Sequence, residues 1–136
     1  MIGIVLITHG KVGIELLLAL EHVVGPQQQA MALAIGPHDD VEKCREDLRA
    51  AVSAVDRGKG VVVCTDMFGG TPSNLAISLL GEKNNLEVIA GVNLPMLVKL
   101  AGVRAQKTLT ESVHDAQESG KKYISVASAL LKGEVA

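Results

Sequence analysis

The stretch IGIVLITHG, residues 2–10, decides the fold of this chain. Its first seven residues form a β-branched, apolar run that stops at His9-Gly10. A continuous apolar run that does not alternate with polar residues is typical of a strand buried on both faces of a sheet. Similar runs recur three times, which predicts strands at residues 2–8, 30–36, 61–65 and 86–92.

Helical patterns fill the segments between these runs. The segment 11–24 is apolar on most sides, so we expect that helix to be buried on more than one face. Asp39 is expected to cap the second helix, and Thr71 the third, with Pro72 at its first position. A fourth helix is expected to start at Asn93-Leu94-Pro95. The predicted helices cover residues 11–24, 39–57, 72–80, 93–103 and 109–119, with Gly120 ending the last one.

Strands that alternate with helices indicate a parallel sheet with helices on both faces. We therefore expect one α/β domain over residues 1–136, a doubly wound sheet with four parallel strands in the order 2-1-3-4. Residues 121–131 alternate polar and apolar side chains and favour a last strand, although SVASALLK also fits a helix.

Composition narrows the classes of function. With 13 basic and 15 acidic residues the net charge is −2, so there is no basic surplus for a nucleic-acid partner. Phe68 and Tyr123 are the two aromatic residues, too few for base stacking. The amino terminus does not resemble a signal peptide, and no run reaches the ~18 apolar residues of a membrane span. We therefore expect a cytoplasmic protein that inserts into no membrane.

Cysteine and histidine spacing gives no metal-binding pattern. Cys64 lies in an apolar run, where a buried thiol acts as a small hydrophobic group, and one disulfide with Cys44 is conceivable. His22 and His114 fall in predicted helices and are interpreted as structural. His38 follows the second strand on the rim that carries His9, and is either a contact for a partner or a solvated loop residue.

His9 and Asp66 stand where the chemistry is expected. They end the first and third strands, which flank the point where the winding of the sheet reverses and where ligands bind in this fold class. A carboxylate bound to one ring nitrogen fixes the tautomer and leaves the other nitrogen as a nucleophile. GGTP, residues 69–72, then opens a helix whose start favours an anion. These features predict phosphoryl transfer through histidine, unless His9 and Asp66 merely cap their strands.

Three segments, LITHG (6–10), TDMFGGTPSN (65–74) and IAGVNLPML (89–97), resemble the mannose-family enzyme IIA of the bacterial phosphotransferase system (PTS) over about residues 1–120. The resemblance implies that Nε2 of His9 accepts phosphate from phospho-HPr and that Asp66 orients His9. It implies no metal and no organic cofactor. The residues implied to contact the phosphoryl group are Gly10, Gly69, Gly70 and Thr71. The residues implied to border the site and meet the partner are Phe68, Asn93 and Pro95.

The resemblance also implies a homodimer whose last, antiparallel strand is exchanged between subunits. Phe68 replaces the tryptophan that is frequent in the family, and a loop position before two glycines favours an exposed anchor over a core residue. The downstream acceptor is expected to be a separate IIB polypeptide, or phosphorylation serves as a regulatory signal. Two alternatives stay open: a phosphocarrier domain of a dihydroxyacetone kinase system, and a regulatory module that binds an anion without covalent chemistry.

Overall fold

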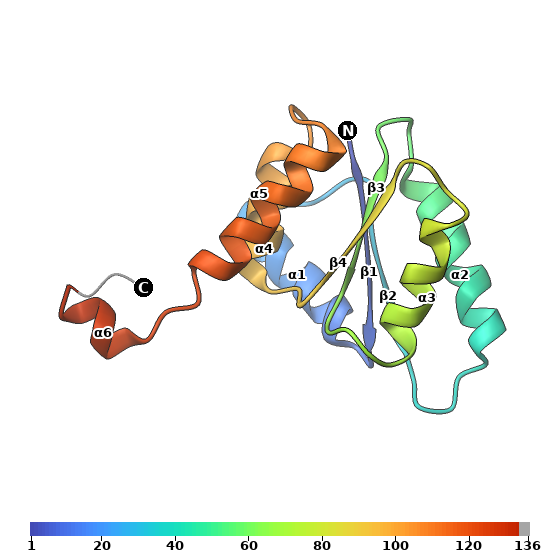
Figure 1. The fold of residues 1–136 in the computed structure, drawn as a ribbon, viewed down its shortest axis with the longest axis horizontal. Coiled ribbons are helices and arrows are strands. Elements are labelled where there is room, and N and C mark those ends of the chain that lie inside the picture. The colour runs from blue at the N-terminus through green and yellow to red at the C-terminus, as the bar shows by residue number, and fades with distance from the viewer. Residues whose placement is uncertain (134–136) are drawn as a thin grey trace.

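The computed structural model describes residues 1–133. Strands and helices alternate along the chain up to the fourth helix (Figure 1). The strands are β1 (Gly3–His9), β2 (Ala30–Ile35), β3 (Val61–Thr65) and β4 (Leu86–Ala90). The helices are α1 (Val12–Val24), α2 (Val41–Val55), α3 (Thr71–Leu80), α4 (Leu94–Val103), α5 (Leu109–Lys122) and α6 (Ala127–Leu131).

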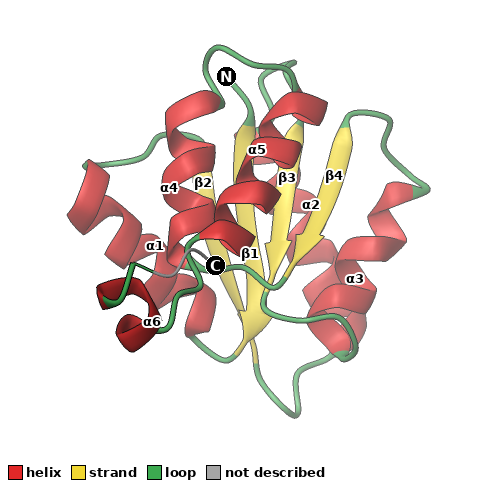
Figure 2. Ribbon diagram, turned by 60° about the vertical axis from the view of Figure 1, so that its left-hand side comes forward, coloured by secondary structure: helices red, strands yellow, loops and turns green. Residues whose placement is uncertain are grey.

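The four strands form one parallel sheet in the order β2-β1-β3-β4, which confirms the predicted topology. Helices α2 and α3 cover one face, and α1, α4 and α5 cover the other (Figure 2). In the β1–β3 pair, Ile7 lies beside Thr65. His9, the last residue of β1, and Asp66, the residue after β3, therefore lie at the same, carboxyl end of the sheet. The switch point between β1 and β3 therefore brings together two residues that are far apart in the chain.

Each face of the sheet has its own apolar core. Val5, Ile7 and Val63 pack on the face under α2 and α3, whereas Ile4 and Leu6 pack on the face under α1, α4 and α5. Cys44 belongs to the first core and Cys64 to the second, so the conceivable disulfide does not form and both thiols are free. Burial raises the pKa of Cys64 to about 12, which keeps that thiol protonated and inert.

Several predicted helix ends differ from the observed ones by one to three residues. Asp40, rather than Asp39, caps α2, and its side chain accepts the N–H of Glu42. The carboxylate of Asp39 instead accepts the N–H of Gly36, in the loop before the helix. Gly70, rather than Thr71, caps α3. Helix α5 continues through Gly120 to Lys122. Gly120 lies close to Met96 and Asn93, so that a Cβ atom there would come within 3.2 Å of Met96.

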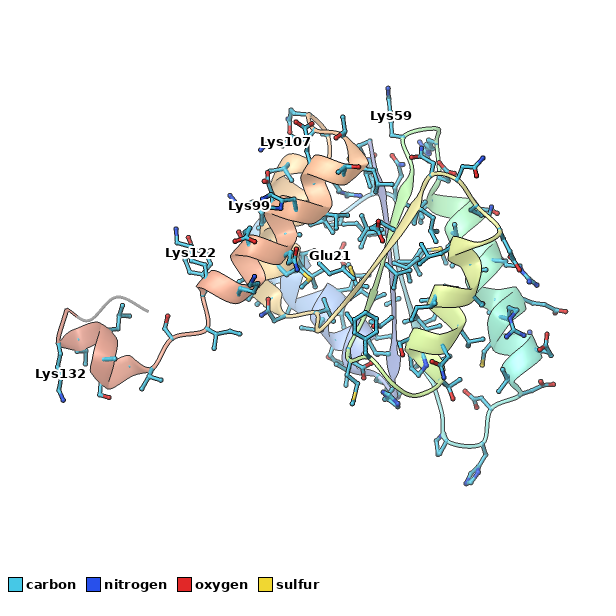
Figure 3. The ribbon with its side chains drawn as sticks, in the orientation of Figure 1. Glu21, Lys59, Lys99, Lys107, Lys122 and Lys132 are labelled. Atoms are coloured by element: carbon cyan, nitrogen blue, oxygen red, sulfur yellow. The ribbon has the colours of Figure 1, made fainter. Side chains whose placement is uncertain are left out.

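The expected fifth strand is absent from the described residues, whose sheet has four strands. Residues 127–131 form α6 instead, which fits the helical alternative for SVASALLK. Within residues 1–133 no strand pairs with residues 123–126, so their alternation does not produce a strand here. The tail between Lys122 and Lys132 projects from the body (Figure 3), and its apolar side chains are exposed: Tyr123, Ile124, Val126, Leu130 and Leu131.

The prediction that the first helix is buried on more than one face is wrong for this single chain. Leu18 and Val23 on α1 are 55% and 58% exposed. Only Gly13 and Leu20 of α1 are fully covered. The helix packs against β1, β2 and α4, and its outer, apolar face is left uncovered by residues 1–133.

Candidate active site

The side chains of His9 and Asp66 meet, as the sequence predicts. Nδ1 of His9 lies 2.9 Å from Oδ2 of Asp66, and the same oxygen accepts the backbone N–H of His9 at 3.1 Å. The other carboxylate oxygen accepts the N–H of Met67 at 3.2 Å. One carboxylate therefore fixes both the backbone and the ring of a histidine that lies 57 positions away in the chain.

The charge of Asp66 determines which ring nitrogen of His9 carries the proton. Partial burial alone would raise the pKa of Asp66, but the hydrogen bonds from the His9 ring and backbone outweigh it, and the pKa lies below the usual range. Asp66 is thus a carboxylate at neutral pH and can only accept. Nδ1 must donate to it, so Nε2 keeps its lone pair.

That lone pair faces the start of α3. A Cβ atom placed on Gly70 would lie 2.9 Å from Nε2 of His9 and 3.1 Å from its Cε1. Gly70 has φ +97° and is the N-cap of α3, where backbone N–H groups have no partner within the helix. A tetrahedral anion held by Nε2 would therefore lie beside the positive end of a helix.

The other predicted phosphoryl contacts flank this point. Gly10 follows His9 directly, adopts φ +54° and donates its N–H to the carbonyl of Ile35 at 2.8 Å. Gly69 adopts φ +83° in the loop before Gly70. Thr71 is the first residue of α3 and is partly exposed, because Gly70 takes the cap position. Contact of these residues with a phosphoryl group stays a prediction.

The site is open to solvent and bordered by apolar side chains. The side chain of His9 is 50% exposed, and Phe68, at 64%, stands out from the loop that follows Asp66. This placement fits the exposed-anchor interpretation of Phe68. An open rim of this kind suits approach by another protein better than enclosure of a small substrate.

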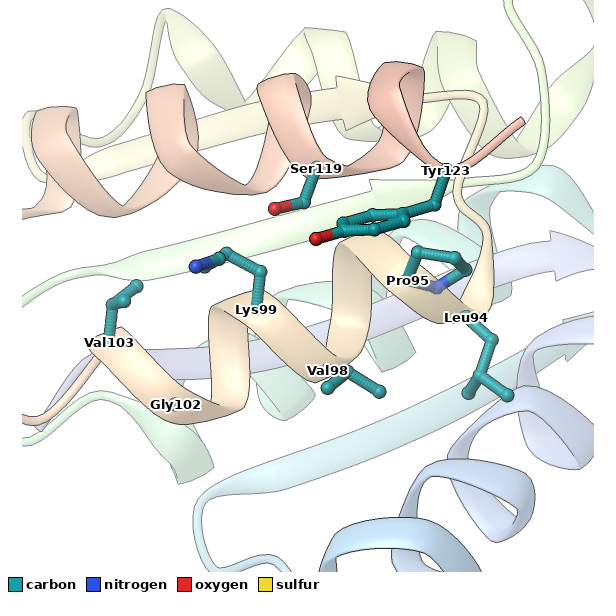
Figure 4. Close-up of a pocket in the computed structure, with 8 residues that line it drawn as sticks. All are labelled: Leu94, Pro95, Val98, Lys99, Gly102, Val103, Ser119 and Tyr123. Carbon is teal, nitrogen blue, oxygen red and sulfur yellow. The ribbon is translucent and has the colours of Figure 1, made fainter. Parts of the chain in front are cut away.

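Asn93 and Pro95 contribute to the fold around α4. The side chain of Asn93 caps α4 by accepting from the N–H of Met96, and donates to the carbonyl of Gly120 at 2.9 Å. Pro95 lies in a groove between α4 and α5 together with Tyr123 (Figure 4). Contact of Asn93 and Pro95 with a partner stays a prediction.

The remaining histidines lie apart from the carboxylate. His38 is exposed in the loop before α2, while His22 and His114 are exposed on α1 and α5. Within residues 1–133 no group of three or more His, Cys, Asp or Glu side chains is placed to hold a metal ion. In the same range, no helix has both the length and the apolar character needed to cross a bilayer.

Thr8 is a buried residue beside the site that the sequence patterns do not single out. Its hydroxyl accepts the N–H of Gly13 at 2.7 Å and lies 3.4 Å from the carbonyl oxygen of Gly10. The sequence does carry one signal for Thr8: it is a hydroxyl residue at the end of an otherwise apolar strand, directly before the candidate nucleophile His9.

Comparisons with known proteins relate the chain to components of one system. The family model EIIA-man, described as PTS system fructose IIA component, matches residues 3–117. The chain is 34% identical over 129 residues to the PTS system mannose-specific EIIAB component of Escherichia coli (strain K12), covering 94% of this chain and 40% of that relative. It is 25% identical over 132 residues to the PTS system fructose-specific EIIA component of Bacillus subtilis (strain 168), covering 97% and 90%.

A solved structure shares the fold over nearly its whole length. The phosphotransferase system component EIIA from Streptococcus agalactiae superposes with a TM-score of 0.86 at 26% identity, covering 95% of this chain and 99% of that one. The chain thus spans about two fifths of the mannose-specific relative and nearly all of the single-component proteins.

Proposed function

Because this chain belongs to the EIIA-man family of PTS system IIA components, we propose that it carries phosphoryl groups on Nε2 of His9. The observation that supports this most directly is the orientation of the ring. Nδ1 is bound to Asp66 at 2.9 Å, and Nε2 points at Gly70, where α3 begins.

The proposed step is an in-line exchange between two imidazoles. The lone pair on Nε2 of His9 attacks the phosphorus of phospho-HPr, the new N–P bond forms, and the N–P bond in HPr breaks, returning its electron pair to the HPr histidine. The proton on Nδ1 stays in place, and Asp66 stabilises the positive charge that develops on the ring. The start of α3 stabilises the transferred anion. Donor and product are both phosphohistidines, so the step is close to reversible.

The onward acceptor is proposed to be a IIB-type domain or protein in the cytoplasm. The name of the E. coli relative joins an A and a B component, and this chain matches about two fifths of that protein. The open rim with the exposed Phe68 gives donor and acceptor the same access to His9 in turn. If the phosphorylated chain instead serves as a regulatory signal, His9 is phosphorylated by the same step, and only the onward transfer is absent.

Incubation with phosphoenolpyruvate, enzyme I and HPr tests this function. We expect intact-mass spectra to show one adduct of about 80 Da, the mass of a phosphoryl group, that acid removes. Omission of HPr is the control and should leave the mass unchanged. A chain that stays unmodified in the complete mixture would favour the module that binds an anion without covalent chemistry.

Replacing Asp66 by alanine is expected to slow phosphorylation by about tenfold to a hundredfold, the worth of one hydrogen bond to a charged group. Without the carboxylate, nothing fixes the Nδ1–H tautomer or stabilises the ring as charge develops. Stopped-time sampling of the adduct gives the rate. Asp56→Ala is the matched control, because Asp56 caps the end of α2 at the opposite edge of the sheet. An Asp66→Ala rate equal to that of Asp56→Ala would remove Asp66 from the mechanism.

The lowered pKa of Asp66 also predicts that its contribution to the stability of the fold depends on pH. A carboxyl group whose pKa is lower in the folded state stabilises the fold above its unfolded pKa of about 4, and this contribution is lost as the pH falls through the folded value. The difference in thermal stability between wild type and Asp66→Asn should therefore be present at neutral pH and shrink below pH ~4. A constant difference across this range would contradict the assignment.

We also propose that the chain works as a homodimer in which residues 123–126 of each copy pair with β4 of the other. β4 is an edge strand, and a groove along it is lined by Phe68, Val113 and Ile124. Ile124 and Val126 are 71% and 69% exposed in the single chain. Such pairing would give β4 a hydrogen-bonded neighbour and remove these side chains from water.

Ending the chain after Lys122 is expected to convert this dimer into a monomer. Sedimentation equilibrium of the full chain and of the shortened chain measures the change, and Leu131→Ser, which keeps residues 123–126, is the control. A shortened chain that still sediments as a dimer would show that another surface, such as the exposed face of α1, holds the two copies together.

A further inference from the structure

The hydroxyl of Thr8 makes hydrogen bonds both to the turn that carries His9 and to the helix that follows it. Thr8 is fully buried at the end of β1. Its Oγ1 accepts the N–H of Gly13, in the first turn of α1, at 2.7 Å, and donates to the carbonyl of Gly10, within the turn, at 3.4 Å. The three residues between Thr8 and α1 are thus spanned by one side chain.

Helix α1 depends on this hydroxyl because its own cap position offers none. Lys11 is the N-cap, and its side chain makes no capping hydrogen bond. The N–H groups of a first helical turn need an acceptor, and Thr8 supplies one from the preceding strand. The contact is close: a Cβ atom on Gly13 would lie 3.1 Å from both Oγ1 and Cγ2 of Thr8.

The direction of the His9 ring follows from the backbone of this turn. The ring itself is half exposed and is held by Asp66 at Nδ1 alone. Its backbone is fixed by the His9 N–H on Asp66 and by the Gly10 N–H on Ile35. The hydrogen bond from Thr8 to the Gly10 carbonyl is a third contact that holds this backbone. Without it the turn, and with it Nε2 of His9, could shift relative to Gly70.

We propose that Thr8 is a positioning residue for phosphoryl transfer: its hydroxyl holds the His9–Lys11 turn so that Nε2 of His9 faces the start of α3. This inference rests on the proposed function of His9. Thr8 has no direct part in the exchange, because its hydroxyl is occupied on the α1 side of the sheet and is closed to solvent.

Thr65 provides a matched control within the same sheet. It is also a fully buried threonine, it ends β3 beside β1, and it directly precedes the other site residue, Asp66. Its hydroxyl, however, has no hydrogen-bond partner within residues 1–133. Thr65→Val therefore removes a buried hydroxyl from the same edge of the sheet without breaking a hydrogen bond, whereas Thr8→Val breaks two.

The experiment compares Thr8→Val, Thr8→Ser and Thr65→Val in the complete phosphorylation mixture. We expect Thr8→Val to lose about tenfold or more in rate, as small misplacements of a reacting group do. Thr8→Ser should recover most of the rate, and Thr65→Val should match wild type. Nitrogen-15 NMR of the His9 ring gives a second readout: Thr8→Val should broaden the Nδ1–H signal, and Thr8→Ser should restore it.

Two results would overturn the inference: a folded Thr8→Val chain with the wild-type rate and ring spectrum, or equal losses in Thr8→Val and Thr65→Val. If Thr8→Val does not fold, Thr8→Ala against Thr8→Ser gives the same comparison. A wild-type chain that takes up no phosphoryl group overturns the proposed function instead, and the ring spectra then still test whether Thr8 holds His9.

Discussion

A chain in which His9 is replaced by glutamine is expected to take up no phosphoryl group from phospho-HPr. Glutamine keeps a polar side chain of similar reach, but its amide nitrogen has no available lone pair, so no N–P bond forms. His9 is the histidine that the described structure joins to a carboxylate, and its Nε2 lies against a helix start. Intact-mass spectra after a long incubation measure the loss, which we expect to be complete.

His38→Gln is the matched control for this experiment. His38 lies on the loop after β2, beside the strand that carries His9, and is exposed. Although His38 lies in the loop just before α2, no hydrogen bond joins its ring to a carboxylate within residues 1–133, so its replacement should leave the adduct unchanged. An adduct that survives in His9→Gln and disappears in His38→Gln would move the phosphoryl site to the neighbouring loop and refute the assignment of His9.

The sequence predicts both the sheet and the contact of His9 with Asp66, because the pattern of strands and helices is compatible with few chain topologies. Continuous apolar runs separated by helices admit a parallel sheet, and the residues that end adjacent parallel strands leave at the same edge. His9 and Asp66 each come at the end of such a run, so the order of the strands is enough to bring them together.

The parts that the sequence did not predict depend on contacts that have no periodic signal. The bonds of Thr8 to Gly10 and Gly13 depend on where α1 starts relative to β1. The tail is the reverse case: its alternating residues fit a strand pattern, but within residues 1–133 they pair with no strand. A strand needs a partner, and a pattern within one chain cannot supply it.

Gly70→Ala is expected to lower the rate of phosphoryl transfer by about a hundredfold or more, since the reacting nitrogen itself is obstructed. The added Cβ would lie 2.9 Å from Nε2 of His9, closer than real Cβ atoms approach other atoms. The ring must then turn away from α3, which weakens the bond to Asp66, or the loop must move, which displaces the helix start. Either response separates Nε2 from the N–H groups that would hold the anion.

Gly69→Ala separates this obstruction from backbone strain. Gly69 and Gly70 both adopt positive φ, +83° and +97°, so alanine at either position is strained, at a cost of about 1–3 kcal/mol. A Cβ on Gly69, however, would meet no atom within 4 Å. Thermal unfolding should therefore show similar destabilisation in the two variants, while the phosphorylation rate should fall far more in Gly70→Ala. Equal rates would mean that the anion does not lie between Nε2 and the start of α3, and the proposed geometry of transfer would have to be abandoned.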